Sequence, residues 1–302
     1  MDLRRLRLFL AVVDHGGFTA AATAVHTAQP ALSLGVRELE RELGATLLVR
    51  SRKGVVLTPA GEALVEPARQ ALRAVEIAAA AVAAVTGVLA GRIDVAALPT
   101  LAADPLAGVA GRFHQAHPRV TVRIVAPDDP TELAAVVRSG RSELGFTEQG
   151  PANDGLVEHA LADQELVAVC PRAGDADLAV LDLAVLDLRR LEGVPLLLTP
   201  VGTSMRNLVD GALRNLGITP LIAVETEQRD ALVPLVLAGA GTAFVPRAIA
   251  DVASTQGAVV RRTRPTLRRQ VVLVHRAGVL SPAGALFLAH ALAGVADRVA
   301  QV

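Results

Sequence analysis

Three polar side chains near the exposed face of one predicted helix have the chemistry to read DNA. A glutamine amide such as that of Gln29 can pair with adenine in the major groove, and a guanidinium such as that of Arg37 can pair with guanine. The hydroxyl of Ser33 lies between them in the sequence. The same side chains also suit a solvated helix face, and the residues alone leave both interpretations open.

Two short helices that meet at a sharp angle are predicted to position these side chains. A glycine pair breaks the helix predicted over residues 4–14, and Thr19 is expected to be the N-cap of an alanine-rich helix that runs to Val25. After a short turn, Pro30 fits the first turn of the second helix, because its missing N–H costs nothing there. This is the helix-turn-helix pattern, whose second helix lies in the major groove. A three-helix core without a nucleic-acid role is the alternative.

A hairpin with a basic tip is predicted directly after the helix pair. Apolar runs over residues 47–49 and 55–57 flank Arg50, Arg52 and Lys53. Positive charges beside a recognition helix suit contact with the phosphates of the adjacent groove.

The overall charge balance excludes a strongly cationic nucleic-acid binder. The 302 residues carry a formal net charge of +0, and among residues 1–60 eight Lys and Arg stand against five Asp and Glu. We therefore expect modest non-specific affinity for DNA and a dimer that binds two half-sites. The length predicts two or three domains.

The N-terminal residues and the single cysteine bear on the compartment of the protein. Asp14 and His15 stop the apolar start before it reaches the length of a signal peptide, so we expect a cytoplasmic protein. Cys170 stands alone and cannot form a disulfide framework or a cysteine metal site within one chain. It is expected to be a buried small hydrophobe in a strand.

A long helix with an apolar seam is predicted after Thr58 and Pro59, which suit an N-cap and a first helical position. The seam repeats at spacings of four and three and consists of Leu64, Ala68, Ala71, Val75, Ala78, Val82 and Val85. This heptad pattern favours packing against the same helix of a second chain, with burial inside its own domain as the alternative. The uncharged part over residues 77–85 is too short to cross a bilayer of about 30 Å, so no membrane partner is expected.

Alternating strands and helices are predicted from Arg92 onward, and they favour two α/β subdomains with a cleft between them. The predicted strands cover residues 93–98, 120–125, 144–146, 166–169, 195–198, 222–224, 242–245 and 271–275. The predicted helices cover residues 101–117, 131–138, 203–216, 229–237 and 282–299.

Hydroxyl groups follow two of these strands at the ends where open α/β sheets bind ligands. Thr100 follows the first strand, and Thr203 and Ser204 follow the strand over residues 195–198. Hydroxyls and amides at helix N-termini would hold an anion between the subdomains, and we expect a small carboxylate. Helix capping explains the two threonines equally well. No serine, histidine and acid are arranged for nucleophilic catalysis, so we expect no enzyme, no cofactor and no metal site.

Five blocks of the sequence resemble the N-terminus of LysR-type transcriptional regulators. They are Leu6–Val13, Gly17–Ala22, Gln29–Ser33, Leu39–Gly44 and Leu57–Gly61, in matching order and spacing. The resemblance extends over the whole chain, more loosely after residue 90. It implies an all-α winged helix-turn-helix over residues 1–58, a linker and dimerisation helix over 59–90, and an effector-binding domain over 91–302. That domain would have the periplasmic-binding-protein type 2 fold, with two Rossmann-like subdomains over about 91–160 plus 271–302 and about 161–270.

The resemblance also implies the residues of two sites. The DNA-binding residues would be Thr19, Thr27, Gln29, Pro30, Ala31, Ser33, Leu34, Arg37, Arg50, Arg52 and Lys53. The effector-binding residues would be Thr100, Leu101, Asp128, Thr147, Val201, Gly202, Thr203 and Ser204. Two features depart from the expected chemistry: members of the family commonly carry a basic or amide residue where Leu34 stands, and Asp128 would repel a carboxylate.

The resulting hypothesis is a ligand-responsive transcriptional regulator that binds double-stranded DNA as a homodimer or homotetramer, with RNA polymerase as a further candidate partner. Closure of the cleft on its effector would pass through the linker helix to the DNA-binding lobes. The alternatives are a solute-binding protein or an α/β enzyme with an N-terminal helical extension. The effector, the operator and the direction of the transcriptional response stay open.

Overall fold

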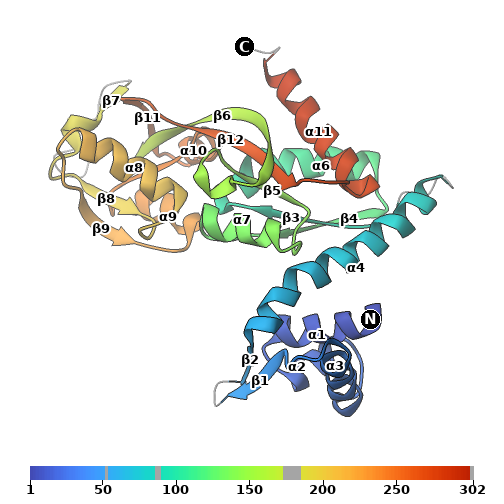
Figure 1. Ribbon diagram of the computed structural model, residues 1–302. Helices are drawn as coiled ribbons and strands as arrows, with labels where there is room; N and C mark the ends of the chain where they lie inside the picture. The colour runs from blue at the N-terminus through green and yellow to red at the C-terminus, as the bar shows by residue number, and fades with distance from the viewer. Residues whose placement is uncertain (52–53, 86–89, 173–184, 300–302) are drawn as a thin grey trace. The chain divides into compact units, whose positions relative to one another are not determined.

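The computed structural model describes residues 1–51, 54–85, 90–172 and 185–299, and it divides into two compact units (Figure 1). The first unit consists of Met1–Gly91 with the short segments Arg138–Arg141 and Val279–Ala283, and the second of the remaining residues. The predicted helix-turn-helix lies in the first unit, and the alternating strands and helices lie in the second.

Three helices, a hairpin and the start of a long helix form the first unit. They are α1 (Leu3–His15), α2 (Phe18–Ala24), α3 (Gln29–Leu43), β1 (Leu48–Ser51), β2 (Gly54–Leu57) and α4 (Pro59–Val85). Asp2 caps α1 by accepting a hydrogen bond from the amide of Arg4 at 3.0 Å, and Gly16 ends it with a φ of 68°. The apolar faces meet in two clusters, which contain Leu6, Phe9, Leu10, Leu39, Leu47 and Ala68, and Ala11, Val12, Ala21, Ala22, Leu32 and Val36.

The expected N-cap of α2 was wrong. The helix begins at Phe18 with Gly17 as its N-cap, and no side chain caps it. Thr19 therefore lies in the first turn, where its carbonyl oxygen accepts a hydrogen bond from the Thr23 hydroxyl at 3.2 Å. Because glycine is itself tolerated at an N-cap, the helix starts before the first hydroxyl in the sequence. The hairpin predicted after the helix pair is confirmed, since β1 and β2 pair antiparallel in this lobe.

Backbone contacts hold the hairpin against the helices. The Glu40 carboxylate of α3 accepts hydrogen bonds from the amides of Leu47 at 2.8 Å and Leu48 at 3.2 Å. Thr58 accepts one from the amide of Gly61 at 3.0 Å, which confirms the predicted N-cap of α4. A Cβ at Gly61 would lie 2.1 Å from the Leu47 carbonyl oxygen, so only glycine allows this close approach.

The first half of α4 packs on its own unit, which corrects part of the predicted dimer seam. Ala68 is 1% exposed in the core of the first unit, and Leu64 and Ala71 pack beside it. Within one chain, Ala68 thus belongs to the core that includes the apolar face of α1, and Leu64 and Ala71 are partly buried against it.

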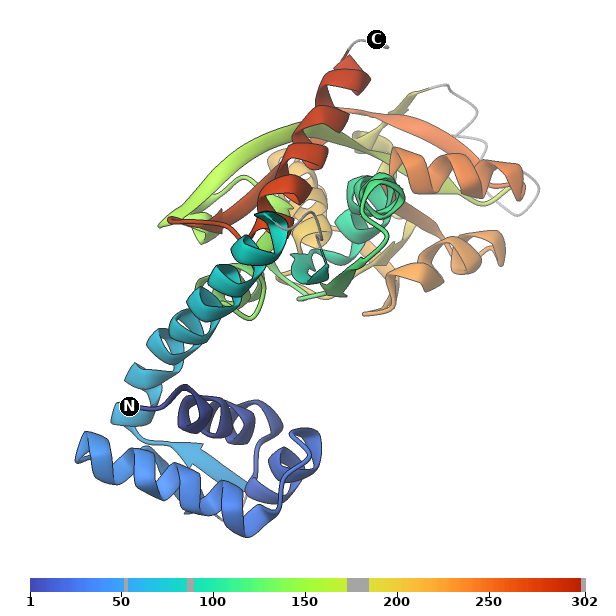
Figure 2. The same cartoon turned by 90° about the vertical axis from the view of Figure 1, so that its right-hand side faces the viewer.

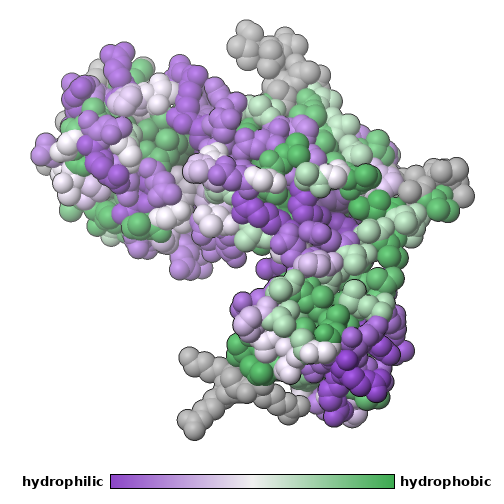
Figure 3. All heavy atoms as spheres, in the orientation of Figure 1, coloured by the Kyte–Doolittle hydropathy of each residue, from purple (hydrophilic) through white to green (hydrophobic). Residues whose placement is uncertain are grey.

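In the second half of α4, the seam side chains that the structure describes are exposed. Val75 and Ala78 are exposed, and Val82 is 69% exposed. Figure 3 shows hydrophobic residues along this helix. The side chain of Val85 lies outside the described residues.

A ten-stranded sheet runs through the described part of the second unit. Its hydrogen-bonded path is β4 (Val120–Val125), β3 (Gly91–Ala97), β5 (Leu144–Glu148), β12 (Leu267–Arg276), β6 (Leu156–Cys170), β10 (Thr242–Pro246), β8 (Pro195–Leu198) and β9 (Leu221–Glu225). Beside this path, β11 (Val259–Arg264) pairs with β6 and with β7 (Val185–Asp187). We call the part with β3, β4 and β5 the β3 half and the part with β8, β9 and β10 the β8 half.

The long antiparallel strands β6 and β12 join the two halves, and Figure 2 shows them crossing the sheet together. β12 pairs with β5 on one side and with β6 on the other, and β6 continues into pairing with β10. Side chains at the middle of these two strands therefore lie between the halves.

Helices and helical turns cover the sheet. They are α5 (Pro99–Leu101), η1 (Ala102–Leu106), α6 (Ala107–Ala116), α7 (Pro130–Arg138), η2 (Pro151–Asn153), η4 (Leu188–Leu191), α8 (Ser204–Asn215), η5 (Arg229–Ala231), α9 (Leu232–Leu237), α10 (Arg247–Thr255) and α11 (Pro282–Val299). In the β3 half, Phe287 of α11 meets Phe113 of α6 at 5.0 Å and Phe146 of β5 at 6.4 Å between ring centroids. No helix among the described residues is both long and apolar enough to span a membrane.

Several predicted elements of this unit need correction. The helix over 101–117 is interrupted at Asp104, whose φ of −151° and ψ of 119° are extended, because the following Pro105 disfavours helical backbone at the residue before it. The strand over 166–169 is only the end of β6, and β7, β11 and α10 were not predicted.

Candidate functional site

The exposed side of α3 carries the predicted base-reading residues. The helix buries its apolar face, which leaves Gln29 and Arg37 exposed and Ser33 partly exposed. Arg37 Nε donates to the Ser33 carbonyl oxygen at 3.3 Å, so its guanidinium lies along the helix surface. The three polar side chains thus occupy positions from which they can reach a ligand outside the lobe.

Further predicted DNA contacts surround these three. Pro30 and Ala31 are exposed in the first turn of α3, and Leu34 is 52% exposed. Thr19 is exposed and Thr27 partly buried. An exposed leucine within a polar surface offers apolar contact of the kind that a thymine methyl group accepts.

The charged side chains of the predicted basic tip lie outside the described residues. Arg50 lies on β1, but its side chain is outside the described residues, as are Arg52 and Lys53 entirely.

A buried arginine lies between the two halves of the sheet. Arg269 of β12 is 6% exposed, and its Cα partner on β6 is Gln164. Its guanidinium donates to Gln164 Oε1 at 3.0 Å from Nε, to Ser204 Oγ at 2.7 Å and to Thr100 Oγ1 at 2.7 Å. Since Thr100 belongs to the β3 half and Ser204 begins α8 in the β8 half, this one side chain bridges both halves.

The charge of Arg269 is balanced through intermediaries. Burial lowers its pKa to about 10, while the carboxylates of Glu148 and Asp104 raise it. Glu148 accepts a hydrogen bond from Ser204 Oγ at 2.5 Å, and the backbone carbonyl of Asp104 accepts one from Gln164 Nε2 at 2.9 Å. Arg269 therefore stays protonated at neutral pH, and a neutral hydrogen-bonding side chain stands between it and each nearby acid.

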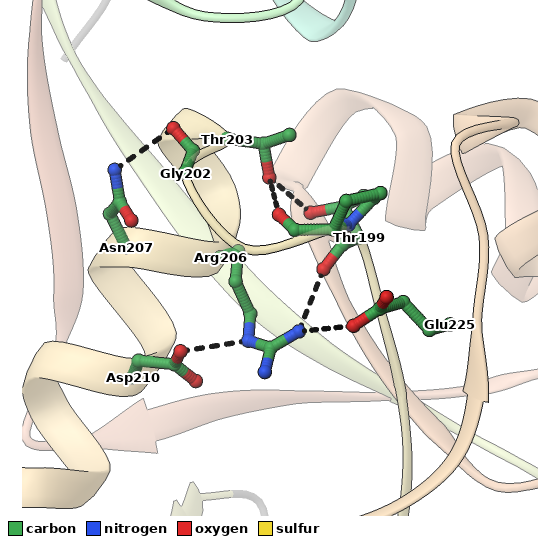
Figure 4. A network of polar contacts seen from close by, with 8 residues as sticks. Thr199, Gly202, Thr203, Arg206, Asn207, Asp210 and Glu225 are labelled. Atoms are coloured by element: carbon green, nitrogen blue, oxygen red, sulfur yellow. Dashed lines mark hydrogen bonds and ion pairs between the residues drawn. The ribbon is translucent and has the colours of Figure 1, made fainter.

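A second buried arginine shapes the loop that leads into α8 (Figure 4). Arg206 donates from Nε to Asp210 at 2.8 Å and from NH1 to the Thr199 carbonyl oxygen and the Glu225 carboxylate, both at 2.9 Å. The Thr199 and Thr203 hydroxyls lie 2.6 Å apart. This network joins β8, β9 and α8, and it fixes the chain that presents Ser204.

Two hollows open beside this loop. One, of about 420 Å³, is lined by Asp129, Pro130, Thr131, Glu148, Gln149, Gly150, Pro151, Ala152, Gly202 and Asn207. The other, of about 180 Å³, is lined by Asp128, Asp129, Pro200, Val201, Gly202, Thr203, Glu227 and Arg229. Both take residues from each half and share Asp129 and Gly202, so they are parts of one cleft, and most of the charged residues in their walls are carboxylates.

A salt bridge crosses the mouth of the cleft. Arg229 NH1 lies 3.0 Å from Asp128 Oδ1, and Arg229 NH2 donates to the Asp128 carbonyl oxygen at 3.3 Å. The negative charge that Asp128 contributes is therefore balanced by a residue of the opposite half.

The predicted effector residues fall into two groups. Four of them line the smaller hollow: Asp128, Val201, Gly202 and Thr203. Thr100 is 5% exposed, and Leu101 and Thr147 are completely buried. The Thr147 hydroxyl has no hydrogen-bond partner among the described residues, and this side chain lines neither hollow.

Capping does not explain the two threonines. The Thr203 side chain makes no N-cap bond and donates to the Pro200 carbonyl oxygen at 2.9 Å, and the Thr100 hydroxyl accepts from Arg269.

Sequence reasoning missed Arg269, Gln164, Glu148 and Arg206. The predicted strand began at Val271, which left Arg269 outside it, although β12 starts at Leu267. No sequence signal separated it from its neighbours, because Arg268, Arg269 and Gln270 are three polar residues in a row, and only the structure shows that Arg269 is the buried one.

Among the described residues, we find neither a reactive thiol nor a metal site. Cys170 is 1% exposed, and burial raises the pKa of its thiol, as expected of a buried small hydrophobe. Across the described residues, no three His, Cys, Asp or Glu side chains are grouped to hold a metal ion.

Family models match both parts of the chain. The model described as "Bacterial regulatory helix-turn-helix protein, lysR family" matches residues 3–62, and "LysR substrate binding domain" matches residues 86–296. The regulator TfdS of Cupriavidus pinatubonensis is 31% identical over 257 residues, which cover 83% of this chain and 84% of that protein. A probable hydrogen peroxide-inducible genes activator of Streptomyces viridosporus is 32% identical, covering 96% and 93%.

Solved structures of related proteins have the same fold. Full-length CbnR in complex with its target DNA is 26% identical with a TM-score of 0.67, covering 96% of this chain and 99% of that one. A full-length OxyR variant from Pseudomonas aeruginosa is 26% identical with a TM-score of 0.75, covering 97% and 94%. The helix-turn-helix match excludes a solute-binding protein with an unrelated extension. The chain belongs to the LysR family of DNA-binding transcriptional regulators with an effector-binding domain.

Proposed function

We propose that α3 reads promoter DNA through Gln29, Ser33 and Arg37, with Thr19, Thr27, Pro30, Ala31 and Leu34 contacting the surrounding groove and backbone. The exposure of this helix face, opposite the buried one, is the observation that carries the proposal. The three charges of Arg50, Arg52 and Lys53 contact phosphates beside it.

Self-association uses the second half of α4. Val75, Ala78 and Val82 offer an uncharged face that one chain leaves exposed, and the chain forms a homodimer or a dimer of dimers through it. Two copies then present two recognition helices to two half-sites. Leu64, Ala68 and Ala71 are left out of this interface, because they complete the core of their own unit.

The effector is a small carboxylate that binds in the cleft between the β3 half and the β8 half. Arg269 supplies a buried positive charge between the halves, in addition to Arg229, which already pairs with Asp128 in the wall of the smaller hollow. The effector is surrounded by residues of both halves, namely Thr100, Leu101, Val201, Gly202, Thr203 and Ser204. Asp128 lies at the mouth of the cleft, and Thr147 lies behind these residues.

The remaining assignments concern the protein as a whole. It is a cytoplasmic regulator without a cofactor or enzymatic activity, and RNA polymerase is a partner at the promoter. Its domains cover residues 1–58, 59–90 and 91–302, with subdomains over about 91–160 plus 271–302 and about 161–270.

DNA footprinting on fragments of the source genome tests the reading helix. Arg37→Ala should lose base discrimination at one position of each half-site, which is worth about 1–3 kcal/mol for a good bidentate contact. Arg247→Ala is the control, because it removes another exposed arginine, from α10 of the other unit. Equal footprints for both variants would exclude Arg37 from base contact.

A further inference from the structure

One hydroxyl stands between a carboxylate and a buried guanidinium in the cleft. Ser204 Oγ donates to Glu148 Oε2 at 2.5 Å and accepts from Arg269 NH1 at 2.7 Å. Ser204 is 5% exposed and Arg269 6% exposed. Glu148 ends β5 in the β3 half, whereas Ser204 begins α8 in the β8 half. The chain thus places one of its own carboxylates at the polar centre between the halves.

We propose that the Glu148 carboxylate occupies the place of the effector's carboxylate, so that Glu148 competes with the effector for Ser204 and Arg269. This inference rests on the effector site proposed above, and it assigns to that site a small monocarboxylate as its ligand and an internal competitor as its regulator.

The hydrogen bonds of Arg269 support this assignment. Its donors reach only neutral oxygens, those of Thr100, Gln164 and Ser204, and no carboxylate of the described residues lies within ion-pair distance of it. A buried charge without a direct counter-ion is costly, so the arrangement favours an anion that can approach more closely. Glu148 comes nearest along the hydrogen bonds, and it reaches the guanidinium only through the Ser204 hydroxyl.

The larger hollow gives both Glu148 and a ligand room to exchange. Glu148 lines this hollow of about 420 Å³ together with Gly202 and Asn207, which precede and follow Ser204 in the chain. Its carboxylate therefore has space into which it can turn when another carboxylate takes its place. Glu148 and Asp129 make the hollow acidic, so an entering anion meets repulsion as well as competition.

Competition predicts that affinity for carboxylates rises when Glu148 is removed. In the wild type a ligand must displace an existing hydrogen bond and enter beside two carboxylates. Glu148→Ala removes the carboxylate that accepts the Ser204 hydrogen bond, and Glu148→Gln keeps the side-chain size while it removes the charge. Either change should tighten binding by about tenfold or more, which corresponds to about 1.4 kcal/mol.

Calorimetric titration of the full-length protein with sodium acetate and sodium benzoate tests this. Acetamide and benzamide serve as uncharged ligand controls, and Glu192→Gln, which removes an exposed charge on the same unit, is the matched protein control. The expected result is tighter carboxylate binding by both Glu148 variants, no gain for the amides, and loss of the gain when Ser204→Ala is added to Glu148→Gln.

Equal affinities of wild type and both Glu148 variants, or no carboxylate binding by any of them, would overturn the inference. A gain for amides as great as for carboxylates would overturn it too, because charge would then be irrelevant. Circular dichroism confirms that each variant is folded. DNA footprints recorded on the same samples distinguish failure of the Glu148 inference from failure of the proposed function. If the footprints are intact and the carboxylate affinities are equal, only the role of Glu148 is rejected.

Discussion

Replacing Arg206 by methionine should destabilise the effector-binding unit by about 2–3 kcal/mol. The Arg206 side chain is 7% exposed and pairs with Asp210, which is 23% exposed, and with Glu225, which is 48% exposed. Breaking a fully buried ion pair typically costs about 3–5 kcal/mol, because it leaves an uncompensated charge. Water already solvates the Glu225 carboxylate, so most of the cost of losing Arg206 arises at Asp210. The expected loss of stability is therefore smaller than for a fully buried pair.

The chain supplies a matched control for burial. Arg247 and Asp251 form the same arginine–aspartate pair at the same spacing on α10, but their side chains are 54% and 61% exposed. Exposed pairs of this kind contribute about 0.3–0.5 kcal/mol, so Arg247→Met should change stability by no more than that. The two variants differ in how far water solvates the abandoned carboxylates, and Arg206→Met also removes the buried hydrogen bond to the Thr199 carbonyl oxygen.

Urea unfolding followed by far-ultraviolet circular dichroism measures both variants. The chain has no tryptophan or tyrosine, which leaves circular dichroism as the more direct signal. A lower midpoint with an unchanged slope is the expected result for Arg206→Met. A loss below about 1 kcal/mol, or a loss equal to that of Arg247→Met, would refute the reasoning that burial makes this pair important.

Two further predictions concern self-association and pH. Val82→Glu places a charge at a position that is 69% exposed, so it should shift sedimentation toward single chains while far-ultraviolet circular dichroism shows an unchanged helix content; unchanged sedimentation would exclude Val82 from the interface. Burial and then the charge of His275 lower the pKa of His159, whose Nε2 lies 3.0 Å from Nε2 of His275. Because the pKa of His159 is lower in the folded state than its ordinary value of 6.5, the free energy of unfolding should be highest above pH 6.5 and should decrease as the pH drops below 6.5. His159→Gln should flatten this dependence in urea titrations, and an equally steep profile would assign it to other groups.

Elements with a local signal were predicted closely from the sequence. The strands over 120–125 and 195–198 and the helix over 282–299 match β4, β8 and α11 at both ends. The signals that identify them are local in the sequence: the apolar periodicity lies within each element, and prolines and glycines lie close to its ends. The exposed polar side of α3 was predicted for the same reason, since burial of every third or fourth residue identifies the opposite side.

The roles of the cleft residues and of the α4 seam depended on tertiary structure. Gln164 and Arg269 are 105 residues apart, and Asp128 and Arg229 are 101 apart, so no local pattern relates either pair. Ala68 follows the same heptad as Val82, but Ala68 packs with the apolar face of α1, whereas no described residue covers Val82, which is 69% exposed. Periodicity establishes that a face is apolar. Which surface covers it, and which distant charge a buried group meets, is decided only when the strands pair and the helices pack.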